Sequence, residues 1–508
     1  MPRFKPVDYN QIKMIPVDFK SQLSPGTFEY TLDYLIEEHL DLSIFNDRYK
    51  NSKTGASAYD PKVLLKIVLL AYSRGITSSR QIEQLCRENI IFMALSCDSQ
   101  PHFTTIAGFI TKLPGEIETI FRDVLFICDD MGLIGKKMFA IDGCKIPSNA
   151  SKEWSGTREQ FKKKKKKMEG VIRRILKKHR EEDKRDHPPS PDMRKREKQQ
   201  IETIKRKARK YKQWLKENTD KPGKRNTPLQ SNITDNESAK LKSSHGVEQG
   251  YCAVAISDEK HQVVLSAEAF GNGDERPTLE PMVKQAQSNL PDSDPFKTAK
   301  LSADSGFCSE FNLKFLFESG IDAYVTDLRF RKRDKRFKSA DRYYPKERCK
   351  TKGKGKFTPK DFIIDPETET CTCPAGKKMW LKSRNPKTWG IPAIQYMAHV
   401  ADCKQCSLRR RCLRNEDQKS PRQFVWFKTH LPEHQTYTKR MKKKIDSDEG
   451  RYEYSKRLGI IEPVFAHITR TLRLNRFSLR GKSKVTAQWL AFCLVHNIKK
   501  IQRYGMVT

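Results

Sequence analysis

The segment from residue 161 to residue 215 constrains the fold most, because it has helical periodicity but is too charged for a domain core. It contains 23 Lys and Arg against 8 Asp and Glu. Its apolar residues recur at intervals of three and four, the spacing of helices packed along a narrow seam. The longer row consists of Ile201, Ile204, Ala208, Tyr211 and Leu215. With "HPPSP" (187–191) as a break, the pattern predicts a basic helical hairpin inserted over residues 156–240.

An unbroken block of lysine opens this hairpin, and the whole chain is strongly basic. The block consists of Lys162, Lys163, Lys164, Lys165, Lys166 and Lys167. The chain has 99 Lys and Arg against 62 Asp and Glu, a formal net charge of +37. A field of this sign attracts polyanions, of which nucleic acid is the commonest in a cell. We therefore favour a hairpin that binds DNA phosphates over a solvated coiled-coil spacer, and a DNA-binding chain over a ribosomal-type or merely basic protein.

Strand-like segments flank the hairpin on both sides. Residues 137–147 have a strand pattern before it, and "QGYCAVAIS" (249–257) and "QVVLSAEAF" (262–270) follow it. A helix, the strand "AKLSADSGF", another helix and the strand "IDAYVTDL" come next. This order predicts an α/β domain built on a mixed sheet flanked by helices. Its parts are residues 133–155, residues 241–328 and a helical C-terminal part, 435–508.

Residues 1–132 are expected to form an all-helical domain. "YDPKVLLKIVLLAYSRG" has Asp60 as N-cap, Pro61 at the first helical position and Gly75 as the stop. The segments "TSSRQIEQLCREN" and "TTIAGFITKL" predict two further helices. Short helices joined by tight turns form either a helix-turn-helix that contacts DNA or an ordinary scaffold. In the first alternative the exposed contact residues would be Arg80, Gln81 and Gln84.

Two aspartates share a setting that suits metal binding. Asp142 in "AIDGCK" and Asp304 in "SADSGF" each close an apolar strand and are soon followed by glycine. Strand ends are where α/β folds expose functional groups, and glycine leaves room beside the carboxylate. Two converging carboxylates suit Mg²⁺, which completes its shell with water and substrate phosphate. Such a site supports an in-line displacement at phosphorus.

A third acid is expected from a C-terminal helix. "YSKRLGIIEPVFAHITR" contains Glu462 among apolar residues that could pack on the sheet, with Arg457 five residues earlier. In a continuous helix these two side chains would point apart, so we expect a bend at Gly459 and place Glu462 near a helix start. Glu449 and Glu453 are competing candidates.

Five of the 13 cysteines lie within residues 371–412. A CxxC pair is half of a tetrahedral zinc site, and nearby Lys and Arg would lower the pKa of the thiols. The alternative is an unmetallated loop, and in either case Cys371 is a spare. We assign the segment to a basic and cysteine-rich insertion, residues 329–434. The candidate zinc ligands are Cys373, Cys403, Cys406 and Cys412.

Eight stretches in consecutive order, covering nearly the whole chain, resemble the DDE transposases of bacterial insertion sequences, of the IS-eleven-eighty-two type. They are "AYDPKVLLKIVLLAYSRGITSSRQIE", "FAIDGCKIPSNAS", "ADSGFCSEFNLKFL" with "GIDAYV", "CPAGKKM", "CKQC" with a later Cys, "IEPVFAHI", "RFSLRGKSKV" and "HNIKK". The resemblance implies an RNase H-like catalytic domain. The implied acids are Asp142, Asp304 and Glu462, which would hold two Mg²⁺ (or Mn²⁺) ions. The one structural Zn²⁺ considered above would lie elsewhere, at the cysteines.

The resemblance also implies the reaction and its partners. The enzyme would bind terminal inverted repeats, hydrolyse a phosphodiester, and direct the exposed 3′-OH at target DNA. Arg457 would contact a phosphate or brace the third acid. The partners would be double-stranded DNA, at the element ends and at the target, and a second copy in a homodimeric synaptic complex.

The sequence departs from the related pattern at three points. Transposases with a Tyr-Arg-Glu-Lys signature have three residues between Arg and Glu, whereas Arg457 and Glu462 are separated by four. Thr469 stands where the signature lysine would fall, and Cys252 stands where asparagine is usual. Two alternatives therefore stay open, a catalytically inactive DNA-binding remnant and an RNase H-like nuclease without strand transfer.

Apolar runs in this chain are short. The longest, "VLLKIVLLAY", is interrupted by Lys66 and does not reach the length of a bilayer span, and no N-terminal stretch has a signal-peptide pattern. We expect a cytoplasmic, nucleoid-associated bacterial protein without a membrane partner.

Overall fold

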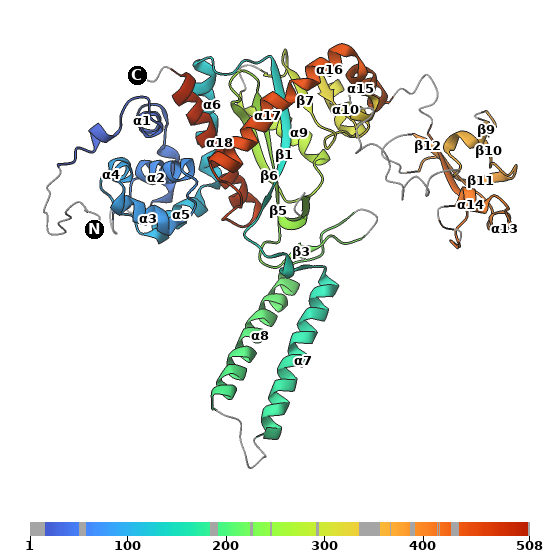
Figure 1. Ribbon diagram of the computed structural model, residues 1–508, viewed down its shortest axis with the longest axis horizontal. Coiled ribbons are helices and arrows are strands. Elements are labelled where there is room, and N and C mark those ends of the chain that lie inside the picture. The colour runs from blue at the N-terminus through green and yellow to red at the C-terminus, as the bar shows by residue number, and fades with distance from the viewer. Residues whose placement is uncertain are drawn as a thin grey trace, which may run out of the picture.

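The computed structural model describes residues 16–505 apart from internal gaps. The gaps are 50–56, 183–190, 224–226, 244–245, 291–293, 335–355, 366, 387–391, 414, 416 and 428–435. Figure 1 shows a central sheet surrounded by helices, a helical hairpin that projects from it, and a second sheet formed by later residues.

The central sheet has six strands and mixes parallel with antiparallel pairs. They are β1 (Met138–Pro147), β4 (Ala239–Ser243), β5 (Gly246–Asp258), β6 (Val264–Phe270), β7 (Lys300–Ala303) and β8 (Ala323–Val325). The order is β4-β5-β1-β7-β8, and β6 pairs with β5. β1, β7 and β8 run parallel, whereas the pairs made by β5 are antiparallel. The predicted mixed α/β architecture is confirmed.

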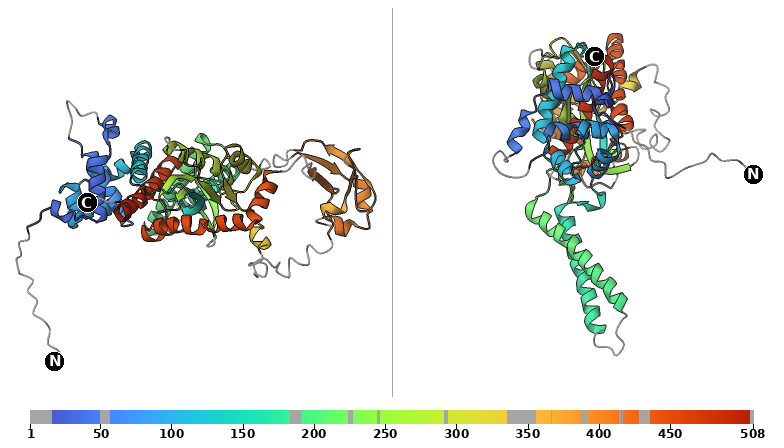
Figure 2. Two further views of the ribbon diagram at one scale, coloured as in Figure 1. Left: turned by 90° about the horizontal axis from the view of Figure 1, so that it is seen from above. Right: turned by 90° about the vertical axis from the view of Figure 1, so that its left-hand side faces the viewer.

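Helices cover both faces of this sheet. On one face Ser257 Oγ of β5 donates a hydrogen bond to the Ile460 carbonyl (3.3 Å). On the other, Ser266 Oγ of β6 donates to the Met282 carbonyl (3.2 Å). The faces are opposite because Ser266 pairs with Ile256, the neighbour of Ser257, and successive side chains of a strand alternate. The two sets of helices lie on opposite sides of the strands in Figure 2. The helices concerned are α9 (Leu279–Asn289) and α17 (Arg457–Ala466).

The longest C-terminal helix, α18 (Lys482–Tyr504), joins the sheet to the N-terminal helices. Its Trp489 Nε1 donates to the Val254 carbonyl of β5 (3.0 Å). Its Phe492 ring stacks on Tyr72 with centroids 4.7 Å apart. It packs against β6, α2 (Pro61–Ser73) and α6 (Pro114–Asp130), so most of its side chains are buried in one continuous core.

The N-terminal region is helical, as predicted. Asp60 caps α2 by accepting from the Lys62 backbone N–H (2.8 Å), and the chain turns at Gly75, where φ is +76°. Three helices of this region, α1, α4 and α6, were not predicted individually; Asn89 separates α3 from α4, which it caps through its side chain. The other helices are α1 (Phe28–Tyr34), α3 (Ser79–Glu88), α4 (Ile90–Ser96) and α5 (Phe103–Lys112).

The basic segment contains two long helices, α7 (Arg158–Glu182) and α8 (Pro191–Glu217), which pack side by side (Figure 1). Phe161, Tyr211 and Trp214 form a buried cluster at the end nearest the sheet. The predicted break at 187–191 lies mostly outside the described residues. Short strands β2 (Ser155–Gly156) and β3 (Ser231–Asn232) pair at the base of the hairpin.

The cysteine-rich segment forms a five-stranded sheet of its own, which was not predicted. Its order is β13-β12-β11-β10-β9, with a separate apolar cluster that includes Tyr396 and Phe424. Its elements are β9 (Ile363–Asp365), β10 (Thr370–Thr372), β11 (Lys378–Ser383), β12 (Ala393–Met397), β13 (Gln423–Phe427), α13 (Val400–Lys404) and α14 (Arg409–Cys412).

The helix that carries Glu462 differs from the prediction. A single residue with helical backbone angles, Lys456, separates α16 (Asp448–Ser455) from α17, and Gly459, where a bend was expected, lies inside α17. Glu462 therefore occupies the middle of α17 and not its start. The remaining helices are α10 (Glu310–Glu318), α11 (Phe330–Arg333) and α15 (Tyr437–Asp446). No helix in the described residues is both long and apolar enough for a membrane span.

Candidate active site

Strand register brings Asp142 and Asp304 together. In the parallel pair of β1 and β7, Ile141 is the partner of Ala303. The next residue on each strand is the aspartate, so the two carboxylates stand side by side. Asp304 follows the last residue of β7, as predicted, but Asp142 does not end its strand. β1 continues to Pro147 because it stays paired with β5.

Backbone and arginine contacts hold the two carboxylates. The Gly143 N–H donates to Asp142 Oδ1 (2.8 Å), and the Gly306 N–H donates to Asp304 Oδ1 (2.7 Å). Arg457 Nη2 of α17 donates to Asp142 Oδ2 (2.5 Å), with only 7% of the arginine side chain exposed. Arg457 Nε is buried and has no hydrogen-bond partner among the described residues. Arg457, which the sequence analysis assigned to the candidate site, thus contacts one of its two aspartates, and its catalytic role stays a prediction.

Burial shapes the electrostatics of the pair. It raises the pKa of Asp142 to about 6, and the Asp304 charge adds to this effect while Arg457 opposes it. A carboxyl with a raised pKa that is surrounded by a second acid and one arginine is typical of a functional cleft.

A third carboxylate, Glu275, joins this pair, although the sequence did not point to it. Burial raises its pKa, and the next largest cause is the charge of Asp304. A Cβ added at Gly306 would lie 2.1 Å from Glu275 Oε2 and 2.9 Å from Asp304 Oδ1, so those two oxygens are within 5.0 Å of each other. Cys252 Sγ contacts Glu275 Oε1 at 3.7 Å. The glycine at 306 thus allows the Glu275 carboxylate to lie there, since any side chain at this position would collide with it.

Glu275 reaches the site because of where β6 ends. Phe270, the last residue of β6, pairs with Cys252, which pairs with Lys145 on β1. The loop after β6 therefore begins level with Lys145, three residues past Asp142 along β1, with β5 lying between the two strands. The available signal was an acid in a Gly-rich loop after an apolar strand, "FGNGDER", but such a loop resembles an ordinary turn.

The other glutamates on the C-terminal helices lie apart from this cluster. Glu462 is exposed on α17, and within the described residues it makes no hydrogen bond or ion pair. Glu453 is buried but pairs with Lys300 (3.3 Å), at the end of β7 opposite Asp304, and with Lys456 (2.9 Å). Glu449 is exposed on α16.

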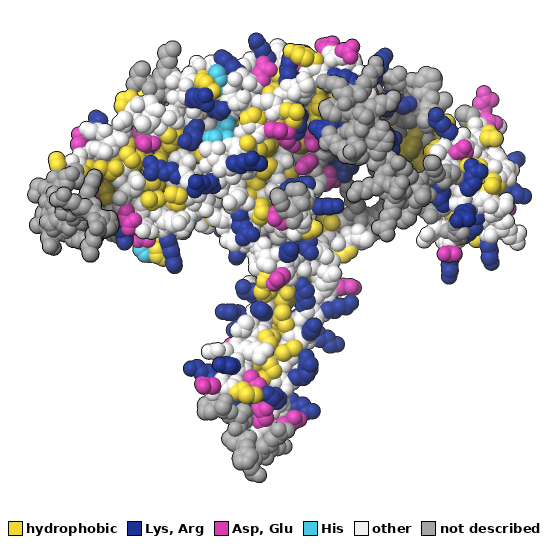
Figure 3. Space-filling view, in the orientation of Figure 1, with side chains coloured by type: hydrophobic (Ala, Val, Ile, Leu, Met, Phe, Trp, Pro, Cys, Tyr) yellow, Lys and Arg dark blue, Asp and Glu magenta, His cyan; other side chains and the backbone are white. Residues whose placement is uncertain are grey.

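The candidate DNA-binding residues occupy two surfaces. Lys and Arg side chains line the hairpin on both sides of an apolar strip (Figure 3). Within the lysine block, Lys164 instead donates to the backbone carbonyls of Glu153 (3.1 Å) and Ser155 (3.3 Å), and Lys165 pairs with Glu169 (3.4 Å). Arg80 is exposed on α3, with its guanidinium over the Phe103 ring. The exposed members of the block are Lys162, Lys163, Lys166 and Lys167.

The four predicted zinc ligands line one small cavity of about 30 Å³. Burial raises the pKa of Cys412, against the expectation that nearby cations would lower it; Arg422 opposes this effect and is outweighed. Cys371 lies apart in the apolar cluster, 3.8 Å from Met379 Sδ. In the described part of the chain, no group of three or more His, Cys, Asp or Glu side chains is arranged to hold a metal ion. The cavity is lined by Cys373, Cys403, Cys406 and Cys412.

Comparison with known families now adds to this geometry. Residues 372–502 match a family model described as "Transposase DDE domain", and residues 17–112 match one described as "Transposase domain (DUF772)". These matches cover less than half of the chain; they indicate an insertion-sequence DDE transposase and support an enzyme that acts on DNA. Comparisons with curated proteins and with solved structures gave no match.

The two matches cover different parts of the chain. One spans α1 to α5, and the other spans most of the cysteine-rich sheet and the helices from α15 to α18. Asp142, Asp304 and Glu275 lie between the two matched ranges, so their roles rest on the geometry described above.

Proposed function

We propose that this transposase is an RNase H-like enzyme of the IS-eleven-eighty-two type, which cleaves phosphodiesters at the inverted-repeat ends of its element and joins the 3′-OH to target DNA. The observation that carries the proposal is the β1–β7 register, which sets Asp142 beside Asp304 on neighbouring interior strands of a mixed sheet. The buried Arg457 on Asp142 supports it.

The residues present fit Mg²⁺ or Mn²⁺ chemically. Asp142, Asp304 and Glu275 offer hard oxygen donors, and Gly306 lets the Glu275 carboxylate lie close to Asp304, because a Cβ at 306 would collide with Glu275 Oε2. Mg²⁺ usually takes only one or two protein carboxylates and completes its shell with water and phosphate, so a site without three preformed ligands is consistent with it. When bound, a pair of such ions would neutralise phosphate charge and activate the attacking oxygen.

The chain's own groups perform the positioning. Arg457 orients Asp142 through its Nη2 and offers its unpaired Nε–H to an anionic oxygen. The Gly143 and Gly306 N–H groups fix the other carboxylate oxygens in place. Glu275 adds negative charge next to Asp304, which increases the attraction of the cluster for cations.

We assign the third acidic position to Glu275, while Glu462 stays the position that the resemblance implies. Comparing Glu275→Gln, Glu462→Gln and Glu453→Gln decides between them. Each variant is assayed for cleavage and, separately, for the rise in melting temperature on adding Mn²⁺ without DNA. We expect a loss of both only in Glu275→Gln. A normal Mn²⁺ response in Glu275→Gln, together with its loss in Glu462→Gln, would assign the third acid to Glu462 on α17 instead.

The cysteine-rich sheet is proposed to hold one structural Zn²⁺. Four soft thiol donors around a cavity of about 30 Å³ suit a tetrahedral ion, although the side chains must turn inward to bind it. The partners proposed for the whole protein are element-end and target DNA and a second copy in a homodimer. A cytoplasmic, nucleoid-associated location follows from those partners.

An assay on labelled element ends with Mg²⁺ tests the proposed reaction. Joined products support transposition, cut products alone would indicate a nuclease without strand transfer, and a shifted band without chemistry would indicate an inactive remnant. DNA that flanks the reading frame offers an independent check, because inverted repeats should border it.

A further inference from the structure

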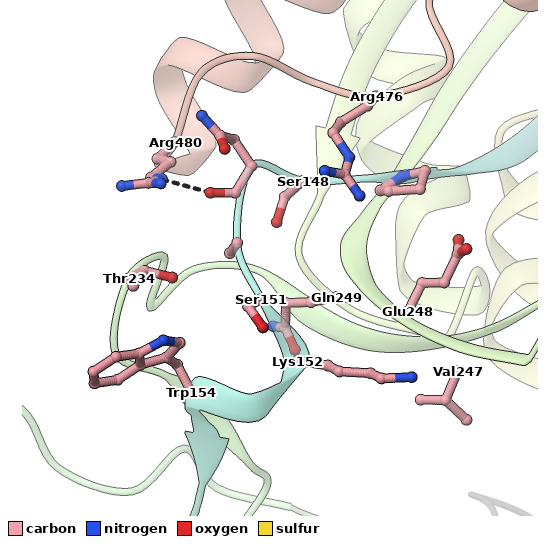
Figure 4. A pocket seen from close by; sticks show the side chains of 13 residues that line it. Ser148, Ser151, Lys152, Trp154, Thr234, Val247, Glu248, Gln249, Arg476 and Arg480 are labelled. Carbon is pink, nitrogen blue, oxygen red and sulfur yellow. Dashed lines mark hydrogen bonds between the residues drawn. The ribbon is translucent and has the colours of Figure 1, made fainter.

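A pocket of about 620 Å³ opens where β1 meets the base of the hairpin. It lies beyond Asp142 on the same strand, past Pro147, at a distance of about 17 Å for five residues of extended chain. The catalytic proposal above does not use it. Figure 4 shows the side chains around this pocket, among them Ser148, Lys152, Trp154 and Arg476.

Hydrogen bonds between distant segments build this pocket. The Phe477 N–H donates to the Pro147 carbonyl (2.9 Å), and Arg480 Nε donates to the Asn149 carbonyl (2.6 Å). Asn149 Nδ2 returns a bond to the Ser478 carbonyl (3.0 Å). The segment before α18 is thereby fixed on the end of β1, and its two arginines, 476 and 480, are among the lining residues.

The pocket is positively charged and contains an unused polar group. Lys152, Arg476 and Arg480 face a single carboxylate, Glu248, among the lining residues. Within the described residues, Arg476 and Lys152 make no ion pair. Ser148 is 1% exposed, and its Oγ has no hydrogen-bond partner in the described structure. Figure 4 shows Ser148 and Arg476 directed toward the same space. A buried unpaired hydroxyl beside unpaired cations suits an anionic oxygen.

We propose that this pocket binds a backbone phosphate of the DNA strand that runs from the carboxylates to the hairpin. This inference rests on the proposed function, because it takes DNA as the substrate. The pocket lies between the acidic cluster and the exposed lysines of α7, so a strand that contacts both passes over it. Arg476 supplies charge, Ser148 supplies a neutral hydrogen bond, and Trp154 in the lining offers an apolar surface to the sugar or base.

The test measures binding of the full-length protein to a labelled element-end duplex across a salt series. Arg476→Gln should lower affinity for element-end and random duplexes alike, and reduce the salt slope by about 1. Ser148→Ala should weaken binding by about 2- to 10-fold without changing the slope, because it removes no charge. Lys314→Gln on α10, an exposed lysine outside the pocket, is the matched control and should behave as wild type.

Further measurements separate the possible failures. Arg476 makes no hydrogen bond within the described residues, so its variant should keep the wild-type melting temperature, which we would confirm. Inorganic phosphate alone should raise the wild-type melting temperature less than the duplex does; an equal rise would indicate a site for free phosphate and overturn the inference. Wild-type affinity and slope in Arg476→Gln would also overturn it. If the wild-type protein bound no DNA at all, the proposed function itself would fail.

Discussion

The carboxylate site and the cysteine site are assembled over very different stretches of chain. Asp142 and Asp304 are 162 residues apart and meet only through the pairing of β1 with β7. The four thiols come from residues 373–412, which fold around an apolar cluster of their own. A site made by strand register depends on the whole sheet, whereas a site made by one segment depends on that segment.

The largest expected effect comes from the carboxylate pair. Asp142→Asn and Asp304→Asn should each lower DNA cleavage and joining by roughly 100-fold or more, because each removes a charge from the cluster. Binding to element-end DNA should change little. Glu449→Gln, at an exposed acid outside the cluster, is the control. Near wild-type cleavage in either carboxylate variant would contradict a catalytic role for that aspartate.

Disrupting the cysteine site should affect only the cysteine-rich segment. Cys403→Ser should abolish the binding of about one zinc per chain and make residues 371–412 sensitive to protease. Cys97→Ser, at an exposed cysteine of the N-terminal region, should keep the metal. The melting of the central sheet should be unchanged in both variants. Zinc-free wild-type protein with an intact cysteine-rich sheet would contradict the proposal.

The lysine block lies at the junction of the hairpin with the sheet, and its members should separate into two classes. Replacing the four exposed lysines by Gln should weaken specific and random DNA alike and lower the salt slope by up to about 0.9 for each phosphate that is no longer neutralised. Lys164→Gln should lower the melting temperature instead, because its Nζ bonds the Glu153 and Ser155 carbonyls at the hairpin base. Weaker binding to the cognate sequence alone would indicate base recognition.

A smaller, pH-dependent effect is expected from two histidines that pack near the turn between β5 and β6. His467 and His496 face each other with Nδ1 atoms 2.8 Å apart, and burial lowers their pKa to about 4 and about 3. The unfolded chain takes up protons first as pH falls below about 6.5, so stability should decline from there toward pH 4. We expect a loss on the order of 2 kcal/mol for each histidine by pH 4.5, so His467→Gln should reduce the total. A flat melting temperature over this range would contradict the burial of the pair.

Local patterns in the sequence were enough to predict some of the helices and one cluster of side chains. The charged 3-4 periodicity indicated the hairpin, the cap at Asp60 indicated α2, and the clustered cysteines indicated residues that line one cavity. In each case the information lies within a few tens of residues, over which backbone periodicity and side-chain spacing act directly.

The sequence by itself thus determined the basic hairpin, the helical N-terminal region, the mixed α/β class, the charge and the two aspartates, whereas the tertiary structure decided which groups meet them. Glu275 reaches Asp304 through the loop after β6, a strand that β5 separates from β1, and Arg457 reaches Asp142 because α17 packs against β1. The exposure of Glu462 and the pocket at Ser148 also depend on how α17 and the segment before α18 pack on the sheet. These outcomes follow from strand register and long-range packing, which depend on residues hundreds of positions apart and leave no local pattern.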